Sequence, residues 1–153
     1  MKYKVLIIIA LIAIIIQFIP YGKEHSNPPV LAEAKWDSPK TEKLFYRACG
    51  DCHSNKTKWP WYSNIAPVSW LVQHDVEEGR EHFNVSMWGK QKRNKGDEAK
   101  EEFEEGEMPP WFYIIAHPEA QLLETERDEL LKGLLATFKK TINFQIIFND
   151  NKI

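Results

Sequence analysis

The chain has 153 residues, 43% of them apolar, which is enough for one folded domain but not for two. A formal net charge of −2 argues against a nucleic-acid-binding protein, because the basic run at residues 90–95 is offset by the acidic residues that follow it. Nine prolines and seven glycines favour helices that are joined by proline-set loops. The composition therefore indicates a small, mainly helical domain.

The N-terminal segment, residues 1–22, is predicted to be an uncleaved signal anchor, that is, a transmembrane helix. Two lysines precede an apolar run over residues 5–19, which only Gln17 interrupts. Residues 3–21 reach the roughly 17–25 residues that a membrane-spanning helix needs. The lysines would keep the N-terminus in the cytoplasm and place the rest outside. A cleaved signal peptide is the alternative, but small residues for cleavage do not follow the apolar run.

A polar segment over residues 23–37 follows, and it carries consecutive prolines. It is predicted to be a linker that holds the next domain off the membrane. Its His25 is expected to be solvated rather than to bind a metal. The folded domain is expected over residues 38–138, with a C-terminal tail over residues 139–153.

The first helix of the domain is predicted to begin at Ser38-Pro39, because serine is a good N-cap and proline is tolerated in the first turn. Its apolar residues share one face at helical spacing, namely Leu44, Phe45, Ala48, Cys49 and Cys52. The two cysteines continue this apolar face, so a group attached to them would become part of the core.

Cys49-Gly50-Asp51-Cys52-His53 contains both cysteines of the chain. Cys-x-x-Cys-His is the spacing at which c-type haem is attached. Two thiols one helical turn apart can each form a thioether bond with a vinyl group of the porphyrin. His53 then lies beneath the iron as its proximal ligand. We therefore expect one covalently attached haem c.

Three other interpretations of the two cysteines account for the motif less well. A thioredoxin-like redox pair needs a strand-helix-strand context, which the flanking sequence lacks. A zinc site needs two further ligands, and the other histidines show no His-x3-His spacing. A disulfide would close a strained small ring and would leave His53 unexplained.

The loop after the motif is unusually aromatic. Trp59, Trp61 and Tyr62 are expected to cover either one edge of the haem or the protein core. Helices are predicted over residues 67–83 and, as a short acidic helix, over residues 97–105. On the first of these, His74 is expected to be exposed and His82 to lie nearer the apolar face.

Met108 is predicted to be the sixth ligand of the iron, because a methionine thioether often fills that position in electron-carrying c-type haems. Gly106 is expected to end the preceding helix, and Pro109 favours an extended Met108. Met108 also lies far enough along the chain from His53 to reach the opposite face of a haem. Met87 and His82 are the remaining candidates.

The last helix is predicted to begin at Thr125, with an apolar face through Phe138 that packs against the first helix of the domain. Beyond it, apolar and polar residues alternate as in a strand, with Ile142, Phe144, Ile146 and Phe148 on one side. This segment would dock on the domain, pair with a partner or stay loose.

These motifs resemble a bacterial haem-binding domain family whose members are membrane-anchored and carry one c-type haem. The resemblance covers roughly residues 35–138. It rests on three stretches of the chain: Trp59-Pro60-Trp61-Tyr62-Ser63-Asn64-Ile65-Ala66-Pro67; the helix from Trp70 to Gly79-Arg80; and Gly106-Glu107-Met108-Pro109 with His117-Pro118-Glu119-Ala120.

The order of the elements also resembles a small class I cytochrome c. That resemblance implies an all-α, cytochrome c-like domain wrapped around one covalently attached haem. By the family resemblance, Cys49 and Cys52 attach the haem, His53 is the proximal ligand and Met108 is the distal ligand.

The expected function is a membrane-tethered single-haem electron carrier and not an enzyme, because a methionine-ligated iron has both axial positions filled. The carrier needs a redox partner protein, which the sequence does not identify. The acidic residues from Glu98 to Glu107 could dock a basic partner through electrostatic steering, although exposed acidic helices usually have no such specific role. The haem domain is expected on the outer side of the bacterial inner membrane, where covalent attachment is completed. The alternatives are a haem-based sensor or small redox catalyst with a displaceable sixth ligand and, third, a haem with a structural role.

Overall fold

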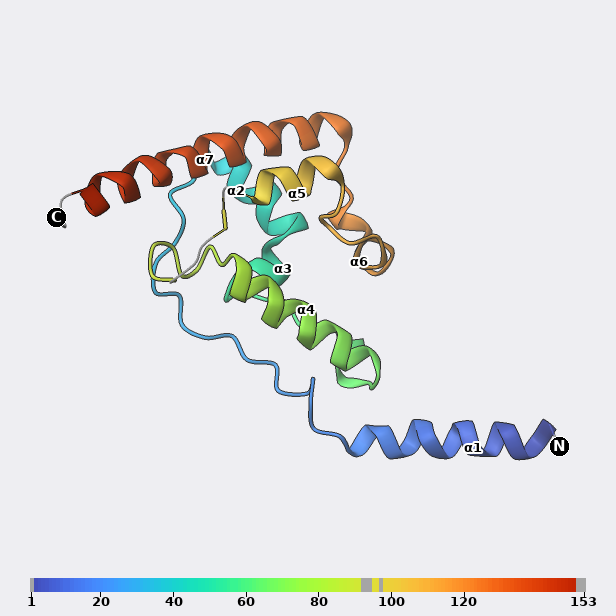
Figure 1. Cartoon of the computed structure of the whole chain (residues 1–153). Helices are drawn as coiled ribbons and strands as arrows, with labels where there is room; N and C mark the ends of the chain where they lie inside the picture. Colours follow the sequence, from blue (N-terminus) through green and yellow to red (C-terminus); the bar gives the residue numbers. More distant parts are fainter. Residues whose placement is uncertain (1, 92–94, 97, 151–153) are drawn as a thin grey trace.

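The structure is a computed structural model that describes residues 2–91, 95–96 and 98–150, without the side chains of residues 139–150. The described residues form helices and no strand, which confirms the predicted all-α class (Figure 1). The helices are α1 (Lys2–Ile15), η1 (Ile16–Phe18), α2 (Pro39–Ala48), α3 (Gly50–His53), η2 (Trp61–Asn64), α4 (Val68–His82), α5 (Ala99–Glu105), α6 (Trp111–Ala116), η3 (Pro118–Ala120) and α7 (Glu124–Asp150).

Helix α2 begins as predicted. The Ser38 hydroxyl accepts a hydrogen bond from the backbone N–H of Thr41 at 3.2 Å, and Pro39 occupies the first helical position. After α2 the chain turns directly into α3, because the N–H of Cys49 donates to the Phe45 carbonyl at 2.7 Å and that of His53 to the Cys49 carbonyl at 3.0 Å. The two cysteines therefore stay on one nearly continuous helical path.

Helix α7 packs against α2, as the apolar face through Phe138 predicted (Figure 1). Leu130, Leu134 and Phe138 are buried in the same core as Phe45. An ion pair between Arg47 and Glu126 also joins the two helices. This packing forms one wall of the core.

The prediction of a strand-like tail is wrong. Helix α7 continues to Asp150, so the alternating residues 142–148 are helical. A helix that has already formed gains one hydrogen bond for each residue added. A strand needs a partner, and the described part of the chain forms no strand to provide one.

The segment predicted as a linker, residues 23–37, lies against the domain. The N–H groups of Leu31 and Ala32 donate to the Ser86 carbonyl at 3.0 and 3.2 Å. His25 is partly buried rather than solvated, because its ring stacks on Trp59 at 4.6 Å between centroids. The segment thereby covers the loop that follows α4 as well as the aromatic loop.

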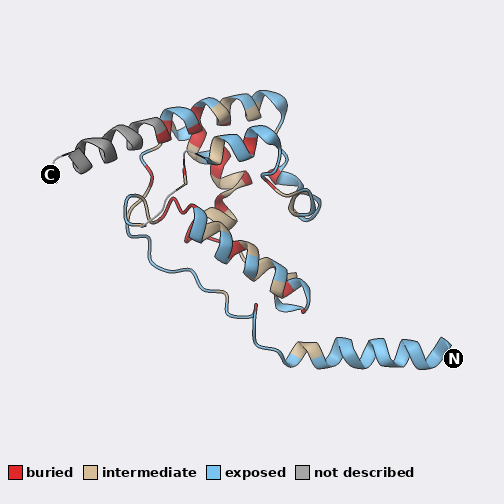
Figure 2. Cartoon of the chain, viewed as in Figure 1, coloured by how far each residue is buried: buried red, intermediate tan, exposed pale blue. Residues whose placement is uncertain are grey.

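Helix α1 is exposed along its whole length (Figure 2). It is 14 residues long, and η1 extends the helical path to Phe18. Among the described residues, no helix is both long enough and apolar enough to cross a membrane.

Helices α4 and α5 correspond to the two helices predicted over residues 67–83 and 97–105, although Asp97 lies outside the described residues. Gly106 ends α5 with a φ of 83°, a left-handed conformation that favours glycine. Phe103 turns inward from α5 and is 1% exposed. Helices α3, α4 and α5 thus enclose the region around the Cys-x-x-Cys-His motif.

Candidate haem site

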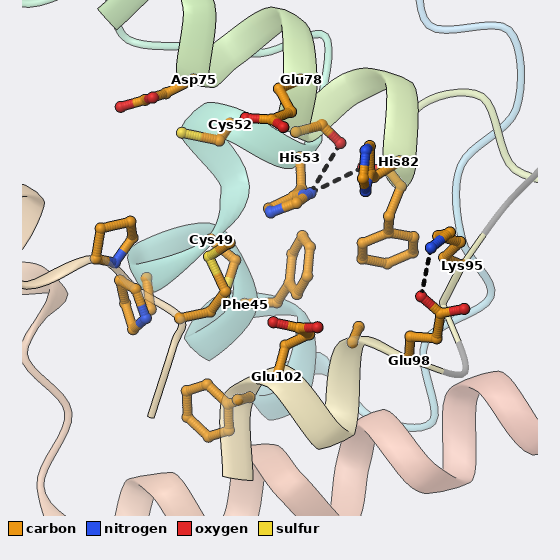
Figure 3. A pocket seen from close by; sticks show the side chains of 18 of the residues that line it. Phe45, Cys49, Cys52, His53, Asp75, Glu78, His82, Lys95, Glu98 and Glu102 are labelled. Atoms are coloured by element: carbon orange, nitrogen blue, oxygen red, sulfur yellow. Dashed lines mark hydrogen bonds and ion pairs between the residues drawn. The ribbon is translucent and has the colours of Figure 1, made fainter. Parts of the chain in front are cut away.

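One cavity of about 430 Å³ lies among α3, α4, α5 and the Met108-Pro109-Pro110 segment (Figure 3). Cys49, Cys52, His53 and Met108 all line it. The structure therefore brings together, around one space, the four residues that the sequence singled out. Cys49 comes from the α2–α3 junction, Cys52 and His53 come from α3, and Met108 comes from the chain after α5.

Both cysteines are free thiols. Burial raises the pKa of each thiol to about 12, and the nearby Asp75 carboxylate adds to the effect at Cys52. A redox-active Cys-x-x-Cys pair has a lowered thiol pKa instead, because the thiolate is the nucleophile. The electrostatic environment thus favours protonated thiols and argues against a thioredoxin-like role.

His53 is oriented by the C-terminal end of α4. Its Nδ1–H donates to the backbone carbonyls of Gly79 at 3.0 Å and Phe83 at 2.9 Å (Figure 3). Burial lowers the pKa of His53, although these two hydrogen bonds oppose the shift. The ring is thereby held as a neutral imidazole with Nε2 available, which is the form in which histidine binds a metal.

Met108 lines the same cavity and is 36% exposed. Its backbone N–H donates to the Glu102 carbonyl at 3.3 Å, which fastens the ligand loop to α5. Of the two other candidates for the sixth ligand, His82 lies on the cavity wall but is exposed, and Met87 does not line the cavity. Met87 instead forms an isolated bridge with Ala32.

The cavity wall is largely apolar and shares residues with the core. Phe45, Phe83, Phe103 and Leu134 belong to both. Acidic side chains from α4 and from the α5 region also line the cavity: Asp75, Glu78, Glu98 and Glu102 (Figure 3). Burial raises the pKa of Asp75, which places this carboxyl closer to protonation than an exposed one.

Sequence reasoning missed Tyr113, which enters the cavity wall from α6. Its hydroxyl donates to the Asp51 carboxylate at 2.8 Å, so α6 is tied to the middle of the Cys-x-x-Cys-His motif. Burial raises the pKa of Tyr113, and the adjacent carboxylate raises it further. No local pattern indicates this pair, because Asp51 occupies a position at which the motif sets no residue type.

Sequence reasoning also gave no role to Arg80. Its guanidinium donates to the Ser54 carbonyl at 2.9 Å and to the Thr57 hydroxyl at 2.8 Å, just after the motif. It donates in addition to the Ser26 carbonyl and the Asn27 side chain, both at 2.9 Å. One side chain thus joins α4, the loop after His53 and the segment over residues 23–37.

The aromatic loop does not cover this cavity. Trp59, Trp61 and Tyr62 are absent from its wall. Trp61 is 76% exposed, and the Tyr62 hydroxyl donates to Nε2 of His117 at 2.6 Å. In place of the expected contact with a haem edge, Tyr62 contacts His117 at the end of α6, and Trp59 stacks on His25.

The residues around the cavity fit a covalently attached haem. Two thiols, an imidazole with one free nitrogen and a thioether share one apolar space, and these are the groups that attach and ligate a c-type haem. In the part of the chain that the structure describes, no group of three or more His, Cys, Asp or Glu side chains is placed to share another metal ion.

Comparison with protein families agrees with this chemistry. Residues 11–136 match the family described as "Haem-binding domain", and the match covers most of the 153 residues. No curated protein and no solved structure matches the chain. From the extent of the family match, the chain belongs to the haem-binding domain family.

Proposed function

We propose that this protein is a single-haem c-type electron carrier, with haem attached to Cys49 and Cys52 and iron ligated by His53 and Met108. The observation that carries the proposal is the convergence of these four side chains on one cavity. When bound, the haem would supply a one-electron Fe(III)/Fe(II) couple. The protein contributes no catalytic group to that exchange and acts by holding the ligands in place.

The chain's own residues support each ligand role. The carbonyls of Gly79 and Phe83 fix the ring of His53 from behind and leave Nε2 for the iron. Met108 is held between α5 and two prolines, so its sulfur can fill the remaining axial position. The apolar side chains of the wall would shield a bound haem from water on their side of the cavity, which supports outer-sphere electron transfer over substrate chemistry.

Residues 1–22 serve, in this proposal, as a membrane anchor that leaves the haem domain on the outer side of the bacterial inner membrane. The exposed apolar surface of α1 supports this role, because α1 has no buried residue. Two lysines at the N-terminus would orient the segment with that end in the cytoplasm. The anchor would confine the carrier to redox partners at the same membrane.

The test is Met108→Ala in the full chain, matured with haem and compared with the unchanged protein by absorption spectroscopy. The unchanged protein should show a weak charge-transfer band at the red end of the oxidised spectrum that disappears on reduction. Met108→Ala should lose this band, become high-spin and bind carbon monoxide in the reduced form. Met87→Ala is the matched control and should behave as the unchanged protein, because Met87 lies outside the cavity.

The partial exposure of Met108 favours one alternative, a haem sensor or small redox catalyst with a displaceable sixth ligand. The same experiment separates the two functions. If the unchanged protein is already high-spin and binds carbon monoxide, the sixth position is open and the carrier proposal is wrong. If Met108→Ala keeps the spectrum of the unchanged protein, Met108 is not the ligand.

A further inference from the structure

We propose that the haem domain lies directly on the lipid bilayer, through an apolar face formed by η2, the start of α4, and α6. This inference rests on the proposed membrane anchor and adds a second, separate contact with lipid. The face, called here the lipid face, consists of Trp61, Ile65, Val68, Leu71, Trp111, Phe112 and Ile115.

The residues of the lipid face are exposed although they are large and apolar. Trp61, Trp111 and Ile115 are 76%, 74% and 73% exposed. The two parts of the face meet, because Val68 and Leu71 of α4 line the same second cavity as Phe112 of α6. A soluble surface rarely gathers so many apolar side chains, and such a patch marks an interaction site.

Helix α6 has the composition of an interfacial segment. Its sequence is Trp-Phe-Tyr-Ile-Ile-Ala, with no charged residue and no buried residue. Tyr113 and Ile114 are partly buried, and Tyr113 is drawn inward through its hydrogen bond to Asp51. Tryptophan and tyrosine are enriched where a membrane protein meets the lipid headgroups, because their rings combine an apolar body with a polar group. Helix α6 therefore presents Trp111 and Ile115 outward, and the Trp111 ring contacts the Phe112 ring of the same helix.

The end of the apolar N-terminal segment is fastened beside this face. The Gln17 side chain donates to the Ala66 carbonyl at 2.9 Å and accepts from the Ala66 N–H at 3.0 Å. Ala66 lies between Ile65 and the start of α4. These two hydrogen bonds hold the start of α4 next to Gln17, which lies near the end of the segment proposed to enter the membrane.

A second set of contacts makes the junction rigid. The Tyr21 hydroxyl donates to the Glu77 carboxylate at 3.1 Å. Gly22 has a φ of 79°, and a Cβ at this position would lie 2.4 Å from the Ser69 carbonyl oxygen, so only glycine fits against α4 here. The domain is thus held in one orientation relative to α1 and does not hang from a free tether.

That orientation turns the lipid face toward the bilayer. In Figure 1, α1 extends away from the domain to one side, and both the η2 end of α4 and α6 lie on that same side. A bilayer crossed by α1 would therefore contact the η2 end of α4 and helix α6. Lipid is favoured over a second copy of the chain, because the Gln17–Ala66 pairing fastens this face to the end of the N-terminal apolar segment, and α1 in that segment has no buried residue. The face would add interfacial burial to the anchoring by α1.

The arrangement would also place the haem site close to the bilayer. Met108 lies just before α6 in the chain, and Tyr113 of α6 lines the haem cavity. With the lipid face buried, the ligand loop would be held near the headgroups. Electron exchange would then favour partners that are themselves embedded in the membrane.

The test uses the full chain, matured with haem in bacterial membranes, with the photoreactive residue p-benzoylphenylalanine replacing one side chain at a time. Positions Trp111 and Trp61 probe the lipid face, and Ile12 probes the anchor. Leu31 is the matched control, because it is 60% exposed and apolar but pairs through its backbone with Ser86, outside the face. After illumination, mass spectrometry of the purified protein counts phospholipid adducts.

We expect phospholipid adducts at positions 12, 61 and 111 that are several-fold more abundant than at position 31. Adducts at 12 but not at 61 or 111 would overturn the lipid face and leave the anchor intact. Absence of adducts at 12 would contradict the anchor itself, whatever happens at 111. A protein–protein adduct between two copies at 111 would show that the face is a dimer interface and would also overturn the inference.

Discussion

Gly79 is the residue that lets α4 approach the Cys-x-x-Cys-His motif closely enough to hold His53. A Cβ at this position would lie 2.8 Å from the Cys52 carbonyl oxygen and 3.0 Å from its Cβ. The backbone oxygen cannot move aside as the end of a flexible side chain can. The hydrogen bond from His53 to the Gly79 carbonyl therefore depends on the absence of a side chain here.

We expect Gly79→Ala to lower the free energy of unfolding of the haem-loaded protein by about 1–3 kcal/mol, the usual cost of overpacking. Helix propensity acts in the opposite direction, because alanine favours a helix over glycine by about 1 kcal/mol. Denaturant unfolding followed by haem absorbance would measure the change. Glu81→Ala is the control, because Glu81 is exposed on the same helix. Equal stability of the two variants would contradict the close packing.

The site residues divide into those with a local sequence signal and those without one. Cys49, Cys52 and His53 could be singled out because the haem attachment proposed for them depends on a fixed short spacing, and all three line one cavity. Arg80 could not be singled out in this way, because a lone arginine on a helix has no local sequence signature. Its hydrogen-bond acceptors include Ser26 and Ser54, which are distant from it in the sequence. Long-range pairing becomes visible only once the fold brings the segments together.

At the scale of elements, predictability followed the strength of the local signal. The start of α2 was indicated by Ser38-Pro39 and the end of α5 by Gly106, since a cap and a left-handed residue act locally. Helix α6 was missed because five of its six residues are aromatic or β-branched, a composition as suitable for a strand. The alternation of apolar and polar side chains over residues 142–148 also indicated a strand, but these residues belong to α7.

The packing of α7 on α2 depends on Gly133 in the same way that the haem motif depends on Gly79. A Cβ there would lie 2.1 Å from Oγ1 and 2.4 Å from Cγ2 of Thr41. Thr41 is itself buried and fixed by its contact with Ser38, where the two hydroxyl oxygens lie 3.0 Å apart. The two helices therefore touch at a point that leaves no room for a methyl group.

We expect Gly133→Ala to destabilise the protein by about 1–3 kcal/mol, measured by denaturant unfolding. The loss should become smaller in a Thr41→Ala background, because that change removes the two closest atoms. Ala136→Gly is the control for helix propensity at an exposed position of α7, and it should cost about 1 kcal/mol. Additive effects of Gly133→Ala and Thr41→Ala would show that the two residues are not in contact.

For the whole molecule, the cavity proposed to hold the haem and the hydrophobic core share one set of side chains. Phe45 and Phe83 line the cavity and also pack together in the core, with ring centroids 5.8 Å apart. Leu134 of α7 also lines the cavity and belongs to the same core. A group that fills the cavity would therefore complete the packing between α2, α4 and α7.

Without haem, the chain should lose fixed tertiary packing. Without haem, the apolar side chains that line the cavity would face solvent, and each Å² of apolar surface left uncovered costs about 25 cal/mol. A small domain has only about 5–15 kcal/mol of stability to lose. We expect the full chain, expressed without haem maturation, to keep its far-ultraviolet helical signal but to lose near-ultraviolet dichroism and to bind a hydrophobic dye. If the haem-free chain instead unfolds cooperatively, with the same denaturant midpoint as the haem-loaded protein, the aromatic side chains of the wall pack without the haem. The haem would then add a redox centre without stabilising the fold.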